Sequence, residues 1–240
     1  MLSLQKYRYN ESMDSEKITL FHGSPEVIEH PVFGVGNPKN DYGLGFYCTD
    51  NLELAKEWAC AENRDGFANR YLLDCRELTL LNLSNGQFHI LNWMAVLLKN
   101  RTFVINHGIA EAAREYILEN FLPHYEDFDI LRGYRADDSY FSFASAFLNN
   151  TISVEQLGYA MRLGGLGEQT VIMSRKAFDR LEFAGAEHVD AGEYYPKRFA
   201  RDRKARDDFR REKDRGPLID GTYIIDIVRN KWKNDDPRLR

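Results

Sequence analysis

Residues 17–24, KITLFHGS, place a short apolar run directly before a histidine, a glycine and a serine. The run has the composition of a strand that packs against a core. A strand ending in His22, Gly23 and Ser24 offers a ligand an imidazole, a backbone that can be approached closely because glycine has no side chain, and a hydroxyl. We therefore expect this strand end to suit a ribose or an amide.

A second stretch, DYGLGFYCTD at residues 41–50, supplies an aromatic ring. Phe46 and Tyr47 predict a second short strand, which follows a loop with four glycines and a proline. The face of Tyr47 can stack on a flat heterocycle if the two strand ends are neighbours. Taken singly, His22 is typical of a structural histidine and Tyr47 of a core residue, so only the combination indicates a site.

Composition sets the limits of the interpretation. The chain has 240 residues, of which 43% are hydrophobic, and a net charge of −5. We expect a polar N-terminal segment at 1–16 and one domain over 17–230. The absence of an apolar run near the ~20 residues of a membrane span predicts a soluble, cytoplasmic protein. Cys48, Cys60 and Cys75 are few and widely spaced, which favours reduced structural thiols.

The order of the expected elements predicts an α+β fold around a mixed or split sheet. Helical signals follow the second strand, with Asp50 or Asn51 as N-cap, and recur over 87–122 up to Pro123. Ser153 and Gln156 form an expected capping box for a later helix. Further strands are expected at RYLLD, LTLLNLS, FDILRGY, QTVIMS and EFAGAEHV, and an apolar element at TYIIDIVR.

Residues 197–215 break this pattern, because they hold ten Lys or Arg and five Asp or Glu with few apolar residues. One interpretation is a solvated charged helix held by opposite charges three or four apart. The other is a basic arm that contacts nucleic acid or a partner, since the local excess is positive in a negative chain. Both remain open at this point.

The combination of FHGS with DYGLGFYCTDNLELAKEWA resembles the NAD-binding signature of the ADP-ribosyltransferase superfamily, in the His-Tyr-Glu branch of the diphtheria-type toxins and poly(ADP-ribose) polymerases. It is still more similar to an uncharacterised bacterial toxin-like family of that superfamily, in which the pattern continues through DILRGYRADDSYF, EQTVIMSRKAFDRLEF and TYIIDIVR. The resemblance covers roughly residues 17–230. It implies a split, mixed β-sheet with surrounding helices that grips NAD in a cleft.

The resemblance also implies residue roles. His22 would bond the adenosine ribose, Gly23 the nicotinamide amide and Ser24 the nicotinamide ribose. Tyr47 would stack on nicotinamide, with Gly45 beside it in the cofactor-binding loop.

The third residue of the signature is usually a glutamate at the start of a later strand, where it stabilises the oxocarbenium ion that forms as nicotinamide leaves. Here Glu168 and Gln169 both precede TVIM, and adjacent strand residues face opposite sides. The closer family pattern points to Gln169, whereas electrostatic stabilisation of the sugar would favour Glu168. We expect Gln169, which favours transfer of one unit over chain elongation.

The loop RGYRADDSYF holds further candidates. Asp137 and Asp138 fit a turn and a helix N-cap, or one of them, with Asp138 our candidate, serves as a general base for the incoming nucleophile. Arg132 or Arg135 would bind the pyrophosphate or the acceptor. The glycines at 34–45 do not open a helix after a strand, as a Rossmann motif requires, and the remaining histidines lack metal-site spacing.

We therefore expect an enzyme that uses NAD as substrate, without a metal, and attaches one ADP-ribose to a protein, RNA or DNA. A bacterial toxin or phage-defence effector fits this activity, with an antitoxin or chaperone as a possible partner and no membrane contact. Two alternatives stay open. One is an inactive module of the same fold that binds NAD or ADP-ribose, and the other is an NAD glycohydrolase in which water is the acceptor.

Overall fold

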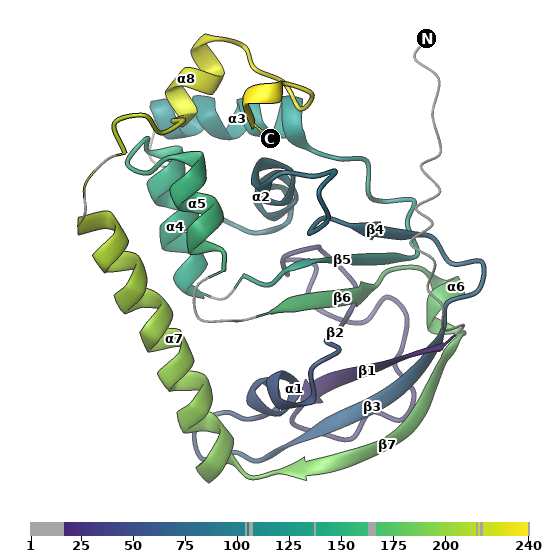
Figure 1. Ribbon diagram of the computed structural model, residues 1–240. Helices are drawn as coiled ribbons and strands as arrows, with labels where there is room; N and C mark the ends of the chain where they lie inside the picture. The colour runs from purple at the N-terminus through teal and green to yellow at the C-terminus, as the bar shows by residue number, and fades with distance from the viewer. Residues whose placement is uncertain are drawn as a thin grey trace.

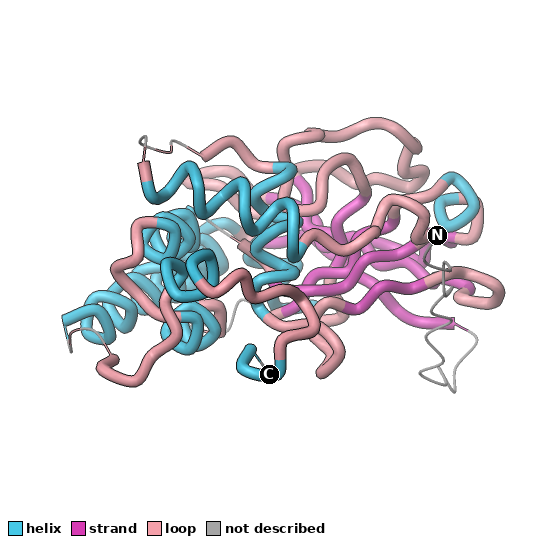
Figure 2. Tube along the Cα trace, turned by 90° about the horizontal axis from the view of Figure 1, so that it is seen from above, coloured by secondary structure: helices cyan, strands magenta, loops and turns pink. Residues whose placement is uncertain are grey.

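The structure is a computed structural model that describes residues 17–103, 105, 108–136, 138–162, 167–214, 216 and 218–239. The described strands form two sheets, and the helices gather mainly at one side of the molecule (Figures 1 and 2). This confirms the expected α+β class. The expected polar segment at 1–16 lies outside the described residues.

Sheet A is antiparallel and has the order β1, β3, β7. Its strands are β1 (Lys17–Ser24), β3 (Gly66–Asp74) and β7 (Leu181–Val189). The His-Gly-Ser end of β1 pairs with Asn69, Ala68 and Phe67 of β3, so these three residues belong to the strand. Their backbone positions are therefore held by the ladder and not by a loop.

Sheet B is mixed and has the order β2, β6, β5, β4. Its strands are β2 (Phe46–Cys48), β6 (Glu168–Ile172), β5 (Ile130–Tyr134) and β4 (Leu80–Asn82). Only β4 and β5 run parallel, and the other neighbours are antiparallel. The short strand β2, predicted from two aromatic residues, is thus an edge strand held by β6.

Among the described residues, the two sheets join at one backbone bridge. Phe21 of β1 and Thr49, just after β2, exchange two backbone hydrogen bonds of 2.8 and 2.9 Å. Away from this bridge the sheets diverge around a small inter-sheet core, formed by Leu20, Cys48, Leu73, Ile130, Ile172 and Ala177. Two diverging sheets are one of the two arrangements, mixed or split, that the order of the elements left open.

Most of the described helices cover the outer faces of the two sheets, while the short helix at Arg175–Phe178 packs into the inter-sheet core through Ala177. The described helices are α1 (Leu52–Ala59), α2 (Ile90–Asn100), α3 (Ile109–Phe121), α4 (Asp138–Leu148), α5 (Val154–Ala160), α6 (Arg175–Phe178), α7 (Ala191–Asp214) and α8 (Ile224–Arg229), with a short 3-10 turn at Pro237–Leu239. Helix α1 packs on sheet A, and α2 to α5 with α8 form a large helical core against Leu131 and Val171 of sheet B. Leu239 joins this helical core, so the packed structure continues past residue 230.

The local signals at helix ends are confirmed. Asn51 caps α1 by accepting a hydrogen bond from the backbone of Leu54. Ser153 and Gln156 form the expected capping box of α5. Each cap satisfies backbone donors that a helix leaves open at its first turn, which is why short polar residues mark helix starts in the sequence.

The charged segment 197–215 belongs mostly to α7. Its basic side chains pair with acidic ones three or four residues away, as in Lys204 with Asp208 and Arg206 with Asp202. The helix also has a buried side, because Ala205 and Phe209 enter the helical core while Tyr194 packs beside α1. Helix α7 therefore runs along one side of the molecule and links both cores, as Figure 1 shows. A nucleic-acid role for its exposed side stays a prediction.

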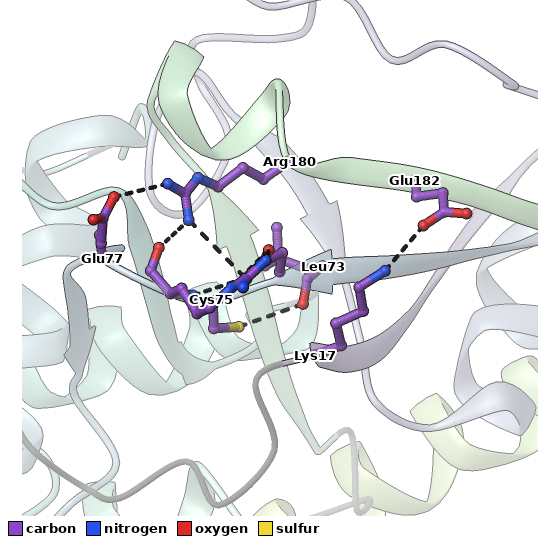
Figure 3. A network of polar contacts seen from close by, with 8 residues as sticks. Lys17, Leu73, Cys75, Glu77, Arg180 and Glu182 are labelled. Carbon is purple, nitrogen blue, oxygen red and sulfur yellow. Dashed lines mark hydrogen bonds and ion pairs between the residues drawn. The ribbon is translucent and has the colours of Figure 1, made fainter.

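Ion pairs connect the strands at the end of sheet A that is far from His22 (Figure 3). Arg180, just before β7, contacts Glu77 at 3.0 Å, and Lys17 contacts Glu182 at 3.3 Å. The Cys75 thiol donates to the carbonyl of Leu73. All three cysteines are free, as their spacing predicted. Among the described residues, no helix combines the length and apolar character that crossing a membrane requires.

Candidate functional site at the junction of the two sheets

His22 lies where β1 meets β2. Its Nδ1 is 2.7 Å from the carbonyl oxygen of Tyr47, and its ring packs on Phe46 with 4.3 Å between ring centroids. A carbonyl oxygen only accepts hydrogen bonds, so Nδ1 carries the proton and donates. Nε2 is then an acceptor, and it has no hydrogen-bond partner among the described residues. Burial lowers the pKa of His22, which favours this neutral form.

The ring of Tyr47 lies on the face of β2 opposite the ring of Phe46, against which His22 packs. The Tyr47 hydroxyl donates to the carbonyl of Gly43 at 2.7 Å and accepts from the backbone N–H of Tyr42 at 3.1 Å. Tyr47 pairs with Val171 of β6, so its side chain shares a face of sheet B with Val171 and Gln169. The structure thus brings Tyr47 near Gln169, whereas His22 meets Tyr47 through its backbone.

The glycines and Ser24 have structural roles. A Cβ on Gly23 would lie 2.1 Å from the carbonyl oxygen of Ala55, so α1 can pack here only against glycine. A Cβ on Gly45 would lie 2.6 Å from a methyl carbon of Val171. The buried Ser24 hydroxyl donates to the carbonyl of Glu26 and accepts from Asn69. A ribose contact of Ser24 would compete with these bonds.

Gln169 and Glu168 face opposite sides of β6, as strand alternation predicted. Gln169 is buried, and its Nε2 lies 2.9 Å from Oδ2 of Asp41 and 3.3 Å from the carbonyl oxygen of Tyr134. Glu168 is on the face of Ile172, where its carboxylate lies 2.5 Å from Nε of Arg132. The two candidates therefore have different neighbours. Gln169 lies beside the carboxyl group of Asp41, and Glu168 lies beside the guanidinium of Arg132.

Asp41 was missed by the sequence analysis, although it begins the quoted stretch DYGLGFYCTD. Its side chain is 7% exposed, and Oδ2 also accepts from the backbone N–H of Ala136 at 2.9 Å. Burial raises the pKa of Asp41, while its hydrogen bonds and nearby Arg101 and Arg135 oppose the rise. A carboxyl group buried beside a candidate catalytic residue is typical of functional sites.

Trp58 on α1 is a second missed residue, because the sequence analysis took it only as part of the helical pattern that follows the second strand. The guanidinium of Arg135 lies 4.1 Å from the centroid of the Trp58 ring. The buried indole Nε1 has no hydrogen-bond partner in the part of the chain that the structure describes. The cation–π contact holds the Arg135 guanidinium over the indole ring.

The structure describes the side chain of Arg132 but not the side chains of the two candidate aspartates. Arg132 bridges Glu168 and Asp50, with 3.0 Å between Nη2 and the Asp50 carboxylate. Asp138 begins α4, but its side chain lies outside the described structure, and so does Asp137. The general-base hypothesis for Asp138 therefore stays a prediction.

A cavity of about 450 Å³ lies beside this site. Its walls include Lys39, Arg101, Phe103 and Arg114, and its described lining contains none of His22, Tyr47 or Gln169. Arg101 connects the cavity to the site, since its Nε is 3.5 Å from Oδ1 of Asp41.

A known protein family matches most of the chain, including the strands that carry the candidate site. A family described as proteins of unknown function, DUF3990, matches residues 18–183. The chain belongs to the DUF3990 family. No curated protein and no solved structure matches the chain.

In this DUF3990 chain, the matched region runs from β1 into β7 and contains His22, Asp41, Tyr47 and Gln169. The charged helix α7 begins after the matched region. The candidate site is therefore a feature of the part shared with the family, and the link that α7 makes between the two cores is outside it.

The lowered pKa of His22 predicts a loss of stability in acid. Because the folded-state pKa lies below the usual value of 6.5, the unfolded chain takes up the proton first as the pH falls. The contribution of His22 is thus fully present above pH 6.5 and is lost as the pH drops toward the folded-state pKa. Urea unfolding at about pH 7.5 and about pH 5.5 should show a smaller acid loss for His22→Gln than for the wild type. Equal losses would contradict this placement of the imidazole.

Proposed function

We propose that this protein is an NAD-dependent ADP-ribosyltransferase that transfers one ADP-ribose to a macromolecule. The observation that carries the proposal is the convergence of three strands. His22 of β1 bonds the backbone of Tyr47 on β2, and β2 pairs with β6, where Gln169 shares the face of Tyr47. These are the residues for which the sequence resembles the NAD-binding signature.

The chemistry suits these groups. The bond between C1′ of the ribose and the nicotinamide nitrogen breaks, and its electron pair stays with nicotinamide, which loses its positive ring charge. The oxocarbenium-like C1′ is then attacked by the acceptor, which gives up a proton. A neutral His22 has Nε2 ready to accept from a ribose hydroxyl, and Tyr47 would supply aromatic surface for nicotinamide.

Gln169 would accept a hydrogen bond from the nicotinamide ribose. A carbonyl oxygen carries only a partial negative charge, so it stabilises the cationic sugar less than a carboxylate. This is consistent with transfer of a single unit. Glu168 is a poorer candidate, since Arg132 already neutralises it. It lies on the face of β6 opposite Gln169, which is the face that carries Ile172 and meets Phe46 and His22.

The test is to incubate the pure protein with NAD labelled in the adenylate and to measure nicotinamide release with and without bacterial lysate. We expect release to rise with lysate and the label to enter macromolecules. Sensitivity of the labelled product to nuclease or to protease identifies the acceptor class. Equal release with and without lysate, with free ADP-ribose as product, would favour an NAD glycohydrolase. Binding of NAD without release would favour an inactive module.

A further inference from the structure

Gln169 has both of its amide hydrogens committed. Its Nε2 donates to Oδ2 of Asp41 at 2.9 Å and to the carbonyl oxygen of Tyr134 at 3.3 Å. An amide nitrogen has two hydrogens, so these bonds use its full donor capacity. Its Oε1 accepts no hydrogen bond from any residue that the structure describes. The Oε1 acceptor of Gln169 is therefore available for a further hydrogen bond, whereas the Nε2 donor is fully used.

Reversal of the amide is disfavoured by both neighbours. If the side chain turned over, Oε1 would face the Asp41 carboxyl oxygen and the Tyr134 carbonyl oxygen, which are both acceptors. Asp41 would keep its bond from Ala136, and Tyr134 its bonds from Tyr42 and Trp93. The two amide bonds of Gln169 would nevertheless be lost and replaced by contacts between acceptors, which is unfavourable in a buried position. The orientation of Gln169 is therefore set by Asp41 and by the end of β5.

Asp41 is itself firmly held. Its Oδ2 also accepts from Ala136 N–H, its Oδ1 lies 3.5 Å from Nε of Arg101, and its backbone carbonyl accepts from Asn100. Each of these partners is a donor, so the carboxyl group meets the Gln169 amide as an acceptor. The loop that carries Asp41 is thus tied to β5, β6 and the end of α2 at one point.

We propose that Asp41 is a positioning residue that holds Gln169 with its carbonyl oxygen toward the sugar hydroxyl of bound NAD. This inference rests on the proposed function. It also accounts for glutamine at a position where the chemistry favours glutamate, because an amide, unlike an ionised carboxylate, both donates to Asp41 and offers an acceptor to the ribose. A hydrogen bond from the amide to a carboxylate polarises the amide, which increases the negative character of Oε1.

A glutamate at position 169 would behave differently. One of its oxygens would replace Nε2 and face Asp41 at hydrogen-bond distance. Two carboxyl groups so close cannot both ionise easily, and the pKa of the pair rises. The introduced glutamate would then share a proton with Asp41 at neutral pH and would not supply its charge to the sugar.

The first experiment is a double-mutant cycle on nicotinamide release. Asp41→Asn should lower kcat about tenfold with an unchanged KM for NAD, the scale for residues that orient a contacting group. In a Gln169→Ala background, Asp41→Asn should have no further effect, because it acts through Gln169. Asp129→Asn is the matched control, since Asp129 bonds Thr79 and Ser174 at the other end of sheet B. Equal losses in both backgrounds would overturn the proposal.

The second experiment follows pH. Gln169→Glu should show release that rises with pH through a raised pKa, and the Asp41→Asn/Gln169→Glu double variant should show the same rise at lower pH. The double variant keeps one carboxyl group in the cluster, so its charge balance matches the wild type. Identical pH profiles for the two variants would show that residues 41 and 169 do not interact.

A third measurement needs no activity. In the ¹⁵N spectrum of the free protein, the side-chain amide of Gln169, identified by its loss in Gln169→Glu, should exchange slowly with solvent. It should exchange faster in Asp41→Asn and at the wild-type rate in Asp129→Asn. A fast-exchanging Gln169 amide in the wild type would overturn the pairing. If the amide is protected but the wild type releases no nicotinamide, the proposed function fails and the pairing stands as structural.

Discussion

Gln169→Ala is expected to lower the rate of nicotinamide release about a hundredfold, the usual cost of removing one group that stabilises a transition state. The KM for NAD should change little, because the contact strengthens only as positive charge develops on the ribose. We choose this residue over its neighbour because Gln169 is on the face of Tyr47 and hydrogen-bonds Asp41. The measurement is kcat and KM for nicotinamide release by the purified variant.

Glu168→Ala is the matched comparison. This substitution removes a partly exposed ion pair with Arg132, which also contacts Asp50. Such pairs contribute ~0–1 kcal/mol to stability, so folding and nicotinamide release should stay near the wild type. Loss of release in Glu168→Ala together with full activity in Gln169→Ala would show that Glu168 is the third residue of the site.

Gly23→Ala is expected to cause a large loss of stability. The added Cβ would lie 2.1 Å from the carbonyl oxygen of Ala55 and 2.7 Å from the amide nitrogen of Ala59. Both atoms are backbone atoms of α1, so the helix must move away from β1. Overpacking of this kind costs ~1–3 kcal/mol or more. The gain from a less flexible unfolded chain is only ~0.4–1 kcal/mol. Urea unfolding should therefore show a net loss.

Gly158→Ala on α5 separates this effect from a general response to alanine. A Cβ at Gly158 meets no atom within 4 Å. Alanine is favoured over glycine inside a helix by ~1 kcal/mol, so this variant should be as stable as the wild type or more stable. If Gly23→Ala unfolds at the urea concentration of the wild type, then α1 does not pack on β1 as closely as the structure indicates.

Most elements could be predicted because their signals are local. Asn51 caps α1, Ser153 and Gln156 cap α5, and each bond joins residues three apart in the sequence. The short strand β2 was predicted from Phe46 and Tyr47 after a glycine-rich loop. The charge pairs of α7 follow from spacings of three and four residues. Its buried side was not predicted, because Ala205 and Phe209 alone do not form an apolar stripe.

The candidate site could be predicted only in part. His22, Tyr47 and Gln169 were proposed from motifs, and strand alternation predicted that Gln169 and Glu168 face opposite sides. Asp41 and Trp58 were missed, since an aspartate before a turn and a tryptophan on a helix have ordinary local explanations. Their roles depend on contacts with Gln169 and Arg135, which are 128 and 77 positions away in the chain.

By itself, the sequence determined the α+β class and the helix caps, because each depends on composition or on spacings of a few residues, and it supplied the motifs from which the candidate site was proposed. Only the tertiary structure decided that His22 bonds the backbone of Tyr47, that Gly23 makes room for α1, and that Asp41 orients Gln169. These relations arise where strands from distant parts of the chain converge, and burial there makes each unpaired polar group costly. Local sequence patterns do not encode such pairings.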